Sequence, residues 1–333
     1  MTAASPAVEA RPSPTDALSA WGRRNAWVVG LLGFLALLLA FTRVIQPNYG
    51  VAGIQGLGIS VLPLCLAAVA QAIVVISGGI DLSIGSMMAL TSVASAVMMK
   101  GQSEEFGVIV VVGVLLLGLL LGAVNGALVV ITRVPDIVVT LAMSFVWAGV
   151  ALLVLKTPGG GSALWLKDLV SGSFLNEWIP KATVVLIVIV AAVWIPLRRS
   201  RLGLSIYAIG SHRLAAFRSG VAVDRTRIVA YALTGLFSAL GGLSLTASTG
   251  IATPVPGPYT LLSVAAIVLG GVSLAGGRGG VFGPIVAVVI LQLIRTDMTF
   301  LNVNTNLAVV VQGLILIGVV MFGSLIQIRR ANA

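Results

Sequence analysis

Few side chains in this 333-residue sequence could carry out chemistry. The chain has one cysteine, Cys65, and one histidine, His212, and neither lies in a spacing typical of a zinc or haem site. The apolar segments also lack a set of nucleophile, base and acid, so they offer almost nothing to a membrane-embedded enzyme. We therefore expect no catalytic residue and no metal site on this chain.

One carboxylate is notable for its position. Asp81 occurs in "ISGGIDLSIGSMMAL", residues 76–90, and no other charged residue occurs between Arg43 and Lys100. A charge left in hydrocarbon costs several kcal/mol, so an acid in a membrane segment usually faces a partner or a cavity. The surroundings of Asp81 therefore decide its role.

Three interpretations of Asp81 are open. Because Asp81-Leu82-Ser83 directly precedes an apolar run, Asp81 or Ser83 could cap the following helix by accepting its free N–H groups. The break at 78–83 is tolerated at membrane depth only where protein or water covers it, so Asp81 could instead line the path of a transported solute. The third interpretation is a proton relay, although no second acid or histidine in a nearby span is available to receive the proton.

A second glycine-rich stretch, "VLGGVSLAGGRGGVFGP" at 268–284, carries Arg278 as its only charge. It lacks the Lys-Ser/Thr pair of a nucleotide-binding loop, and no strand pattern precedes it. Close packing of helices through small residues explains these glycines better than a nucleotide site does.

Composition places most of the chain in lipid. It is 58% hydrophobic and 9% charged, with a mean hydropathy of +1.11, whereas soluble domains have about 25% charged residues. We expect an all-α polytopic membrane protein with one transmembrane domain at 26–326, a disordered tail at 1–25 and a short tail at 327–333. About ten segments are long and apolar enough to be spans: 26–43, 58–77, 82–99, 107–131, 137–155, 182–197, 228–249, 260–275, 281–296 and 306–325.

The distribution of charge predicts the orientation of these spans. If the N-terminus is cytoplasmic, 14 of the 20 basic residues fall on the cytoplasmic side and six outside, while the acidic residues divide five and five. This excess obeys the positive-inside rule, so we expect both termini in the cytoplasm. The net charge of +10 then requires no nucleic-acid partner, because orientation and contact with anionic lipid account for it.

The outer loop at 156–181 is too long to be a simple turn. It carries Trp165, Phe174 and Trp178 among a few charges. Such aromatics could anchor at the lipid headgroups or belong to a docking surface, and composition does not decide between the two.

The inner loop at 198–227 is more informative. It contains a short helical run, His212 to Ser219, with Ser211 as its expected N-cap and Gly220 at its end. The run is either part of a solvated basic loop whose only role is to set the membrane orientation, or a short helix whose apolar side chains contact another protein.

Four motifs together carry a resemblance to a known family. They are "GGIDLSIGS" (78–86), "NGALVVITRVPDIVVTLAM" (125–143), "GLSIYAIGSHRLAAFRSGVAV" (203–223) and "LGGVSLAGGRGG" (269–280). In order and spacing they resemble the membrane subunits of bacterial ABC importers for monosaccharides of the ribose, xylose, galactose and arabinose type. The resemblance covers roughly residues 50 to 325. Two departures are Asp136-Ile137-Val138 after Pro135, where the family often has an aromatic residue, and Gly210-Ser211-His212-Arg213, where it often has Gly-Gly-Asn-Glu.

The resemblance implies a type II-like importer permease in the bacterial inner membrane. It implies a second permease copy, a soluble sugar-binding protein outside, and ATP and Mg²⁺ on a separate cytoplasmic ATPase, with no cofactor on this chain. It also implies that a coupling helix contacts the ATPase at Ser211, His212, Arg213, Leu214, Ala215, Ala216, Phe217, Arg218, Ser219 and Gly220. The "GGIDLS" segment resembles the element beside the translocation pathway, so Gly78, Gly79, Asp81 and Ser83 become candidate pathway or gating residues.

The expected function is therefore that of a sugar importer permease. Sugars are neutral, so a pathway needs polar groups compatible with hydroxyls, and the available ones are Gln71, Ser83, Ser86, Thr91, Asn125 and Thr140. Each of these could equally form a hydrogen bond between packed spans, worth about 1 kcal/mol or less. Other cargo of the same superfamily, such as a branched-chain amino acid, a nucleoside or a polyol, is an alternative. An ion-coupled secondary transporter is another, but it would need more intramembrane acids or an ion site in inverted repeats.

Overall fold

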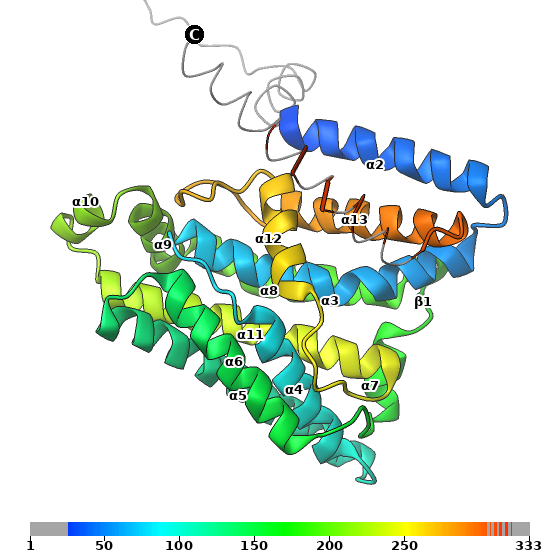
Figure 1. Ribbon diagram of the computed structural model, residues 1–333, viewed down its shortest axis with the longest axis horizontal. Coiled ribbons are helices and arrows are strands. Elements are labelled where there is room, and N and C mark those ends of the chain that lie inside the picture. The colour runs from blue at the N-terminus through cyan, green and yellow to red at the C-terminus, as the bar shows by residue number, and fades with distance from the viewer. Residues whose placement is uncertain are drawn as a thin grey trace, which may run out of the picture.

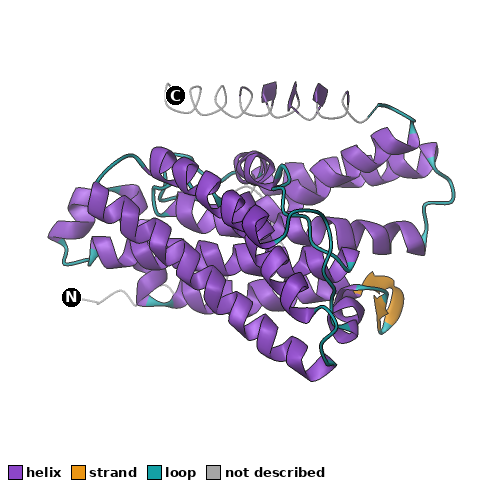
Figure 2. Ribbon diagram, turned by 60° about the horizontal axis from the view of Figure 1, so that its bottom comes forward, coloured by secondary structure: helices purple, strands orange, loops and turns teal. Residues whose placement is uncertain are grey.

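The computed structural model describes residues 26–304 and a few positions between 307 and 321. The expected tails at 1–25 and 327–333, and most of the expected span at 306–325, lie outside the described residues. The described part is almost entirely helical, with one small hairpin (Figures 1 and 2). Its elements are α2 (Ala26–Ile45), α3 (Val51–Ile76), α4 (Ile84–Met99), α5 (Glu104–Thr132), α6 (Asp136–Val154), α7 (Leu164–Val170), β1 (Ser173–Phe174), β2 (Asn176–Pro180), α8 (Lys181–Arg199), α9 (Arg201–Ser211), α10 (Arg213–Arg218), α11 (Val223–Thr249), α12 (Tyr259–Leu269) and α13 (Phe282–Phe300).

Seven of these helices are long and apolar enough to cross a membrane, namely α2, α3, α5, α6, α8, α11 and α13. The apolar helices α4 and α12 are shorter, with 16 and 11 residues. At 1.5 Å per residue, α12 is only about 16 Å long, roughly half the hydrocarbon thickness of a bilayer. The chain is a multi-pass membrane protein. The first nine expected spans each overlap a helix, but two of these helices are too short to cross alone.

The expected span at 260–275 is wrong at its C-terminal end. The helix α12 stops at Leu269, and Gly271 has φ +81°, which a helix cannot accommodate. Gly270 and Gly283 pack so closely that a methyl group on either would overlap the other's backbone. The glycines of 268–284 therefore serve both close packing and a tight, non-helical connection.

The helix α3 forms the centre of the molecule (Figure 1). All residues from Val61 to Ile76 are buried, and α3 packs against α8, α11, α12 and α13. The helices α2 and α6 lie on the outside and expose apolar side chains, such as Leu37 (63% exposed) and Phe145 (72%). Exposed apolar surface of this extent suits contact with lipid tails.

Small residues bring α5 and α11 together. A methyl group on Gly122 would overlap the Tyr231 carbonyl oxygen, and one on Gly235 would overlap the Gly118 carbonyl oxygen. Backbones that approach this closely are typical of glycines spaced four apart in membrane helices, as Gly118, Gly122 and Gly126 are here. This contact fixes α11 beside α5 over much of its length.

The bundle has two chemically different ends (Figure 1). The first, called the arginine-rich end below, contains α9, α10, the α5–α6 connection, the start of α11 and the α12–α13 loop. Its basic residues are Arg133, Arg198, Arg199, Arg201, Arg213, Arg218, Arg225, Arg227 and Arg278. The opposite end contains α7 and the β1–β2 hairpin, with Arg43, Lys100, Lys156, Lys167, Lys181 and Arg295. Within the described part of the chain, the basic residues thus separate into two groups, as the span order predicted for them.

The inner loop expected at 198–227 contains two helices, not one. The unexpected helix α9 begins after Ser200, whose Oγ accepts a hydrogen bond from the Gly203 N–H at 3.1 Å. It buries Ile206 and Ile209. The N-cap serine and this apolar spacing are the sequence signals that indicate α9. They were overlooked because the surrounding basic residues are typical of a solvated loop.

Candidate functional site

The break between α3 and α4 lies inside the protein. Ser77, Gly79, Asp81 and Ser83 are all buried. The chain turns at Gly78, which has φ +85°, a conformation that glycine adopts without strain. Protein therefore covers most of this non-helical segment, as backbone at membrane depth requires.

Asp81 is fully buried and bonds within its own loop. Its Oδ1 accepts hydrogen bonds from the Ser83 N–H at 2.8 Å and the Ser83 hydroxyl at 2.6 Å. The Ser83 oxygen accepts a further bond from Asn125 Nδ2 of α5 at 2.7 Å, and Asn125 Oδ1 accepts from Trp147 Nε1 of α6 at 3.2 Å. The second Asp81 oxygen, Oδ2, has no hydrogen-bond partner among the described residues.

Of the three interpretations of Asp81, the capping of α4 by Asp81 or Ser83 is wrong. Ser83 occupies the N-cap position, but its side chain accepts no bond from the helix, and Asp81 accepts from Ser83 rather than from an N–H group within α4. Instead, Oγ1 of Thr260 at the start of α12 accepts from the Gly85 N–H at 2.9 Å and donates to the Leu82 carbonyl at 3.4 Å. Two short helices therefore meet at their N-termini through one threonine.

Thr140 of α6 holds the break from another helix. Its Oγ1 accepts from the Leu82 N–H at 3.1 Å and lies 3.2 Å from the Ile80 carbonyl oxygen. The break is thus fixed by hydroxyl groups of α6 and α12, which leaves little freedom for it to move independently of these helices.

A buried ion pair beside the break was missed by the sequence analysis. Arg227 Nη2 of α11 donates to both carboxylate oxygens of Asp136, each at 2.6 Å, and the Tyr231 hydroxyl donates to Asp136 Oδ2 at 2.7 Å. The two charged side chains are only 8% and 17% exposed. Gly79 lies beneath them, because a methyl group there would meet both the carboxylate and the tyrosine hydroxyl. The sequence signal for this pair was weak, because Arg227 looks like one of the many basic residues that set the orientation of the spans.

Three glycine-containing segments meet at the arginine-rich end. The Gly277 N–H donates to the Ile76 carbonyl at 2.9 Å. A methyl group on Gly210 of α9 would overlap that same carbonyl oxygen, and one on Gly276 would lie 3.0 Å from the Gly78 Cα. Backbone therefore touches backbone where the end of α3, the end of α9 and the α12–α13 loop cross.

Tyr207 adds a side-chain link between α9 and the same loop. Its hydroxyl donates to the Gly279 carbonyl at 2.8 Å. Burial raises the pKa of the Tyr207 hydroxyl above its ordinary value, so the group keeps the proton that this bond needs.

The short helix α10 begins at a different residue from the one expected. His212 is its N-cap, with Nδ1 accepting from the Ala215 N–H at 3.1 Å, whereas Ser211 is the last residue of α9. The expected N-cap at Ser211 is therefore wrong by one residue.

The C-terminal end of α10 is closed at Gly220, as expected. Gly220 has φ +83°, its N–H donates to the Phe217 carbonyl at 3.0 Å, and the Val221 N–H donates to the Ala216 carbonyl at 3.1 Å. This is the Schellman pattern of helix termination. A helix of six residues with both ends closed has a defined shape despite its length.

The apolar residues of α10 face in two directions. Ala216 is buried with Ile209 and Val223. Leu214 and Phe217 are 52% and 67% exposed. The helix projects from the arginine-rich end (Figure 1) and presents two large apolar side chains there.

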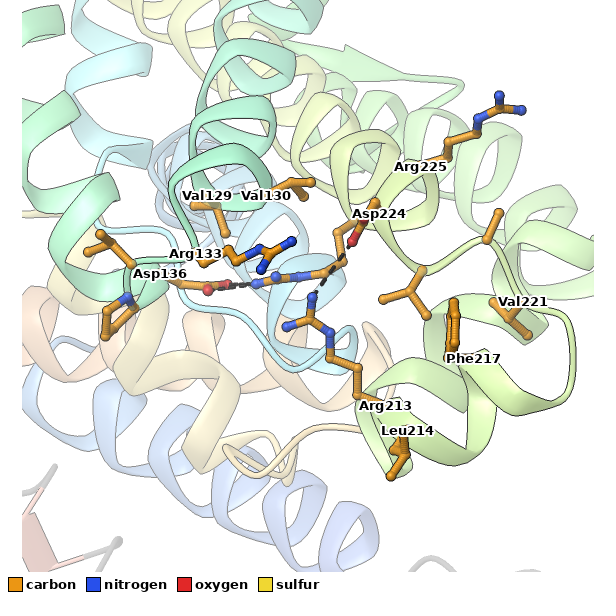
Figure 3. A pocket seen from close by; sticks show the side chains of 15 residues that line it. Val129, Val130, Arg133, Asp136, Arg213, Leu214, Phe217, Val221, Asp224 and Arg225 are labelled. Carbon is orange, nitrogen blue, oxygen red and sulfur yellow. Dashed lines mark hydrogen bonds and ion pairs between the residues drawn. The ribbon is translucent and has the colours of Figure 1, made fainter.

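A groove of about 890 Å³ lies next to α10. Figure 3 shows Val129 and Val130 of α5 on one side and Leu214 and Phe217 of α10 on the other. Arg213 crosses the groove to Asp224 of α11, with nitrogen and oxygen 3.6 Å apart. The groove is therefore open, with apolar walls and arginines at its rim.

Comparison with known proteins assigns this arrangement to a family. The profile of the family described as "Branched-chain amino acid transport system / permease component" matches residues 53–320, which include every helix from α4 to α13 and nearly all of α3. The chain belongs to this family. The matched range includes the break between α3 and α4, the crossing of glycine-containing segments, and α10.

Several members of this permease family are similar over most of their length. The ribose import permease protein of Escherichia coli (strain K12) is 30% identical over 310 residues, which cover 89% of this chain and 95% of the relative. The ribose import permease protein of Bacillus subtilis (strain 168) is 33% identical over 264 residues, covering 76% and 78%. The autoinducer 2 import system permease protein of Escherichia coli (strain K12 / DH10B) is 28% identical over 323 residues, covering 92% and 94%. No solved structure matches the chain at a significant level.

Within this permease, the candidate pathway residues singled out from the sequence lie in three places. Gly78, Gly79, Asp81, Ser83, Asn125 and Thr140 gather at the break. Ser86 and Thr91 are buried along α4, and Thr91 Oγ1 donates to the Met87 carbonyl at 2.7 Å. Gln71 is buried in α3, and neither of its polar side-chain atoms has a hydrogen-bond partner among the described residues. None of these residues lines the groove beside α10.

Proposed function

We propose that this chain is the transmembrane subunit of an ATP-driven importer for a neutral sugar. It works with a second permease copy, a cytoplasmic ATPase that hydrolyses ATP, and a binding protein that delivers the sugar outside. The family match and the ribose and autoinducer 2 import permeases among its relatives support this function. The chain itself then needs no catalytic residue.

The arginine-rich end lies in the cytoplasm under this proposal, and the membrane is the bacterial inner membrane. The nine arginines gathered there by α9, α10 and the adjoining loops support this orientation through the positive-inside rule. Both termini are then cytoplasmic, and the α7 and β1–β2 segment faces outside.

The projection of α10 from the bundle is the main support for its role in coupling the permease to the ATPase. Leu214 and Phe217 give it an apolar surface that a groove on an ATPase could bury, and Ala216 fixes it to α9 and α11. A movement of α10 would be transmitted to the break through Gly210 and Gly78, because no flexible side chain lies between these two backbone segments. The break would pass it to α12 through Thr260.

Reconstitution tests this function. The permease, its cognate ATPase and its binding protein are incorporated into proteoliposomes, and accumulation of radiolabelled D-ribose is measured with ATP on the ATPase side. We expect uphill uptake that requires all three proteins and ATP. Leucine in place of D-ribose tests the amino-acid alternative. Accumulation of either solute by the permease alone, driven by a proton or sodium gradient, would overturn the proposal.

A further inference from the structure

We infer that a second cavity, at the end of the bundle opposite α10, binds the transported sugar through Tyr259, Gln292 and Arg295. This inference rests on the proposed function and assigns it a substrate site. The cavity has a volume of about 490 Å³ and lies between α3, α11, α12 and α13. Its lining residues are Gly56, Ile59, Ser60, Pro63, Leu64, Leu245, Ser248, Thr249, Pro258, Tyr259, Leu262, Gln292 and Arg295.

Three polar side chains of the cavity are free to bind a ligand. The Tyr259 hydroxyl, the Gln292 amide and the Arg295 guanidinium line the cavity and have no hydrogen-bond partner among the described residues, although the Arg295 charge acts on the Tyr259 hydroxyl. Together they offer a hydroxyl, an amide that both donates and accepts, and a guanidinium with several donors. Polar groups that line an otherwise apolar cavity without partners in the chain are suited to a solute or water.

The remaining polar groups of the cavity present acceptors. The Ser60 hydroxyl donates to the Leu57 carbonyl, and the Ser248 and Thr249 hydroxyls donate to the Leu245 carbonyl. Each hydroxyl has then used its proton on backbone. The Ser60 and Ser248 oxygens have lone pairs available to accept a hydrogen bond, whereas the Thr249 oxygen already accepts from the Ile251 N–H at 3.4 Å. The cavity can therefore match a ligand that both donates and accepts at several positions, as a polyhydroxylated ring does.

The apolar walls suit the C–H faces of a sugar. Pro63, Leu64 and Leu262 supply aliphatic surface, and the Tyr259 ring adds an aromatic one. The lining contains no acid, so nothing in it would balance the ammonium group of an amino acid. Arg295 would pair with the carboxylate of an amino acid, so this composition suits a neutral sugar without excluding leucine.

The floor of the cavity is connected to the break. Tyr259 precedes Thr260, whose Oγ1 accepts from the Gly85 N–H and contacts the Leu82 carbonyl. The Gly78 end of the same break touches Gly210 of α9. A sugar bound against Tyr259 would therefore lie at one end of a continuous contact path from α10.

Modification of a cysteine after assembly tests the site without disturbing folding. Gln292→Cys is made in the full importer, reconstituted as above, and treated from the side of the binding protein with a membrane-impermeant methanethiosulfonate reagent. Native Cys65 is fully buried, and wild-type complex serves as its control. Ser171→Cys, at an exposed position after α7, is the matched control. We expect modification of the Gln292→Cys protein to lower ATP-driven D-ribose uptake by about tenfold or more. The reason is that the modified side chain removes one or two hydrogen bonds to the sugar or blocks its access to the cavity.

A charge-matched pair supplies the second measurement. Arg295→Gln should lower D-ribose uptake by about tenfold while assembly with the ATPase is retained. Arg43→Gln removes an arginine from the same end of the molecule but outside the cavity, and should leave uptake near the wild-type rate. If both cavity variants take up D-ribose at the wild-type rate, the inference is overturned and the proposed function is left intact. Failure of the reagent to modify the Gln292→Cys protein would have the same consequence. Absence of uptake in the wild-type importer would instead overturn the proposed function.

Discussion

Gly210, the penultimate residue of α9, lies against the carbonyl oxygen of Ile76 at the end of α3, with no room for a side chain between them. This contact joins the helix that precedes α10 to the helix that precedes the break. Because both partners are backbone, the contact has little compliance. A displacement of α9 must move the end of α3 and the break with it.

Replacing Gly210 with alanine should therefore damage both stability and transport. The methyl group favours the helix by about 1 kcal/mol, but its overlap with backbone should cost about 1–3 kcal/mol or more. We expect a lower Tm in detergent and a loss of ATP-driven uptake. Gly113→Ala is the control, because its methyl group would meet no atom within 4 Å. A Gly210→Ala protein as stable and active as the control would show that the crossing is not tight.

The Asp136–Arg227 pair should stabilise the fold as a unit. Either Arg227→Gln or Asp136→Asn leaves one buried charge without its partner, which costs about 3–5 kcal/mol. The double variant should be destabilised by much less than the sum of the single changes, as a double-mutant cycle of Tm values in detergent would measure. Lys181→Gln breaks the exposed pair with Asp168 and should cost about 1 kcal/mol or less. Additive effects at 136 and 227 would contradict the assignment.

Thr260→Val tests the link between α4 and α12. Valine keeps the shape of threonine but leaves the Gly85 N–H without its acceptor, at a cost of about 1–3 kcal/mol. We expect a lower Tm and slower uptake. Thr299→Val removes a hydroxyl that bonds only to the Arg295 carbonyl of its own helix, so it should change neither. Equal behaviour of the two variants would argue against a role for Thr260 at this junction.

Asp81→Asn distinguishes a structural from a transport role for the buried acid. The Asn oxygen can still accept from the Ser83 N–H and hydroxyl, so we expect normal assembly and uptake near the wild-type rate. Asp81→Leu removes the acceptor and should destabilise the protein by about 1–3 kcal/mol. If Asp81→Asn assembles normally but takes up no D-ribose, Asp81 acts on the solute or on a proton.

Local patterns in the sequence predicted the features that depend on neighbouring residues. Apolar run lengths located the helices, the glycines around Asp81 marked the break, and the run ending at Gly220 marked α10. Features made by distant residues were not predictable in this way. The Asp136–Arg227 pair joins residues 91 apart, and the Gly85–Thr260 bond joins residues 175 apart.

The physical reason is that these distant groups look ordinary in their local context. Arg227 resembles every other arginine of a cytoplasmic loop until α11 brings it to Asp136. Thr260 resembles any hydroxyl near a helix start, where local rules give the cap to the preceding loop. The packing of α11 and α12 decides both pairings, and neither a helical period nor a capping rule contains that information.

The coupling role of α10 is tested most directly by ATP hydrolysis in the reconstituted importer. Leu214→Glu with Phe217→Glu places two charges on the exposed apolar surface while Ala216 stays packed, and Leu204→Glu does the same to an exposed leucine of α9 as the control. We predict that the α10 variant inserts and folds normally but loses the ATP hydrolysis stimulated by binding protein and D-ribose, and that the α9 variant retains it. Full stimulation in the α10 variant would contradict transmission through this helix.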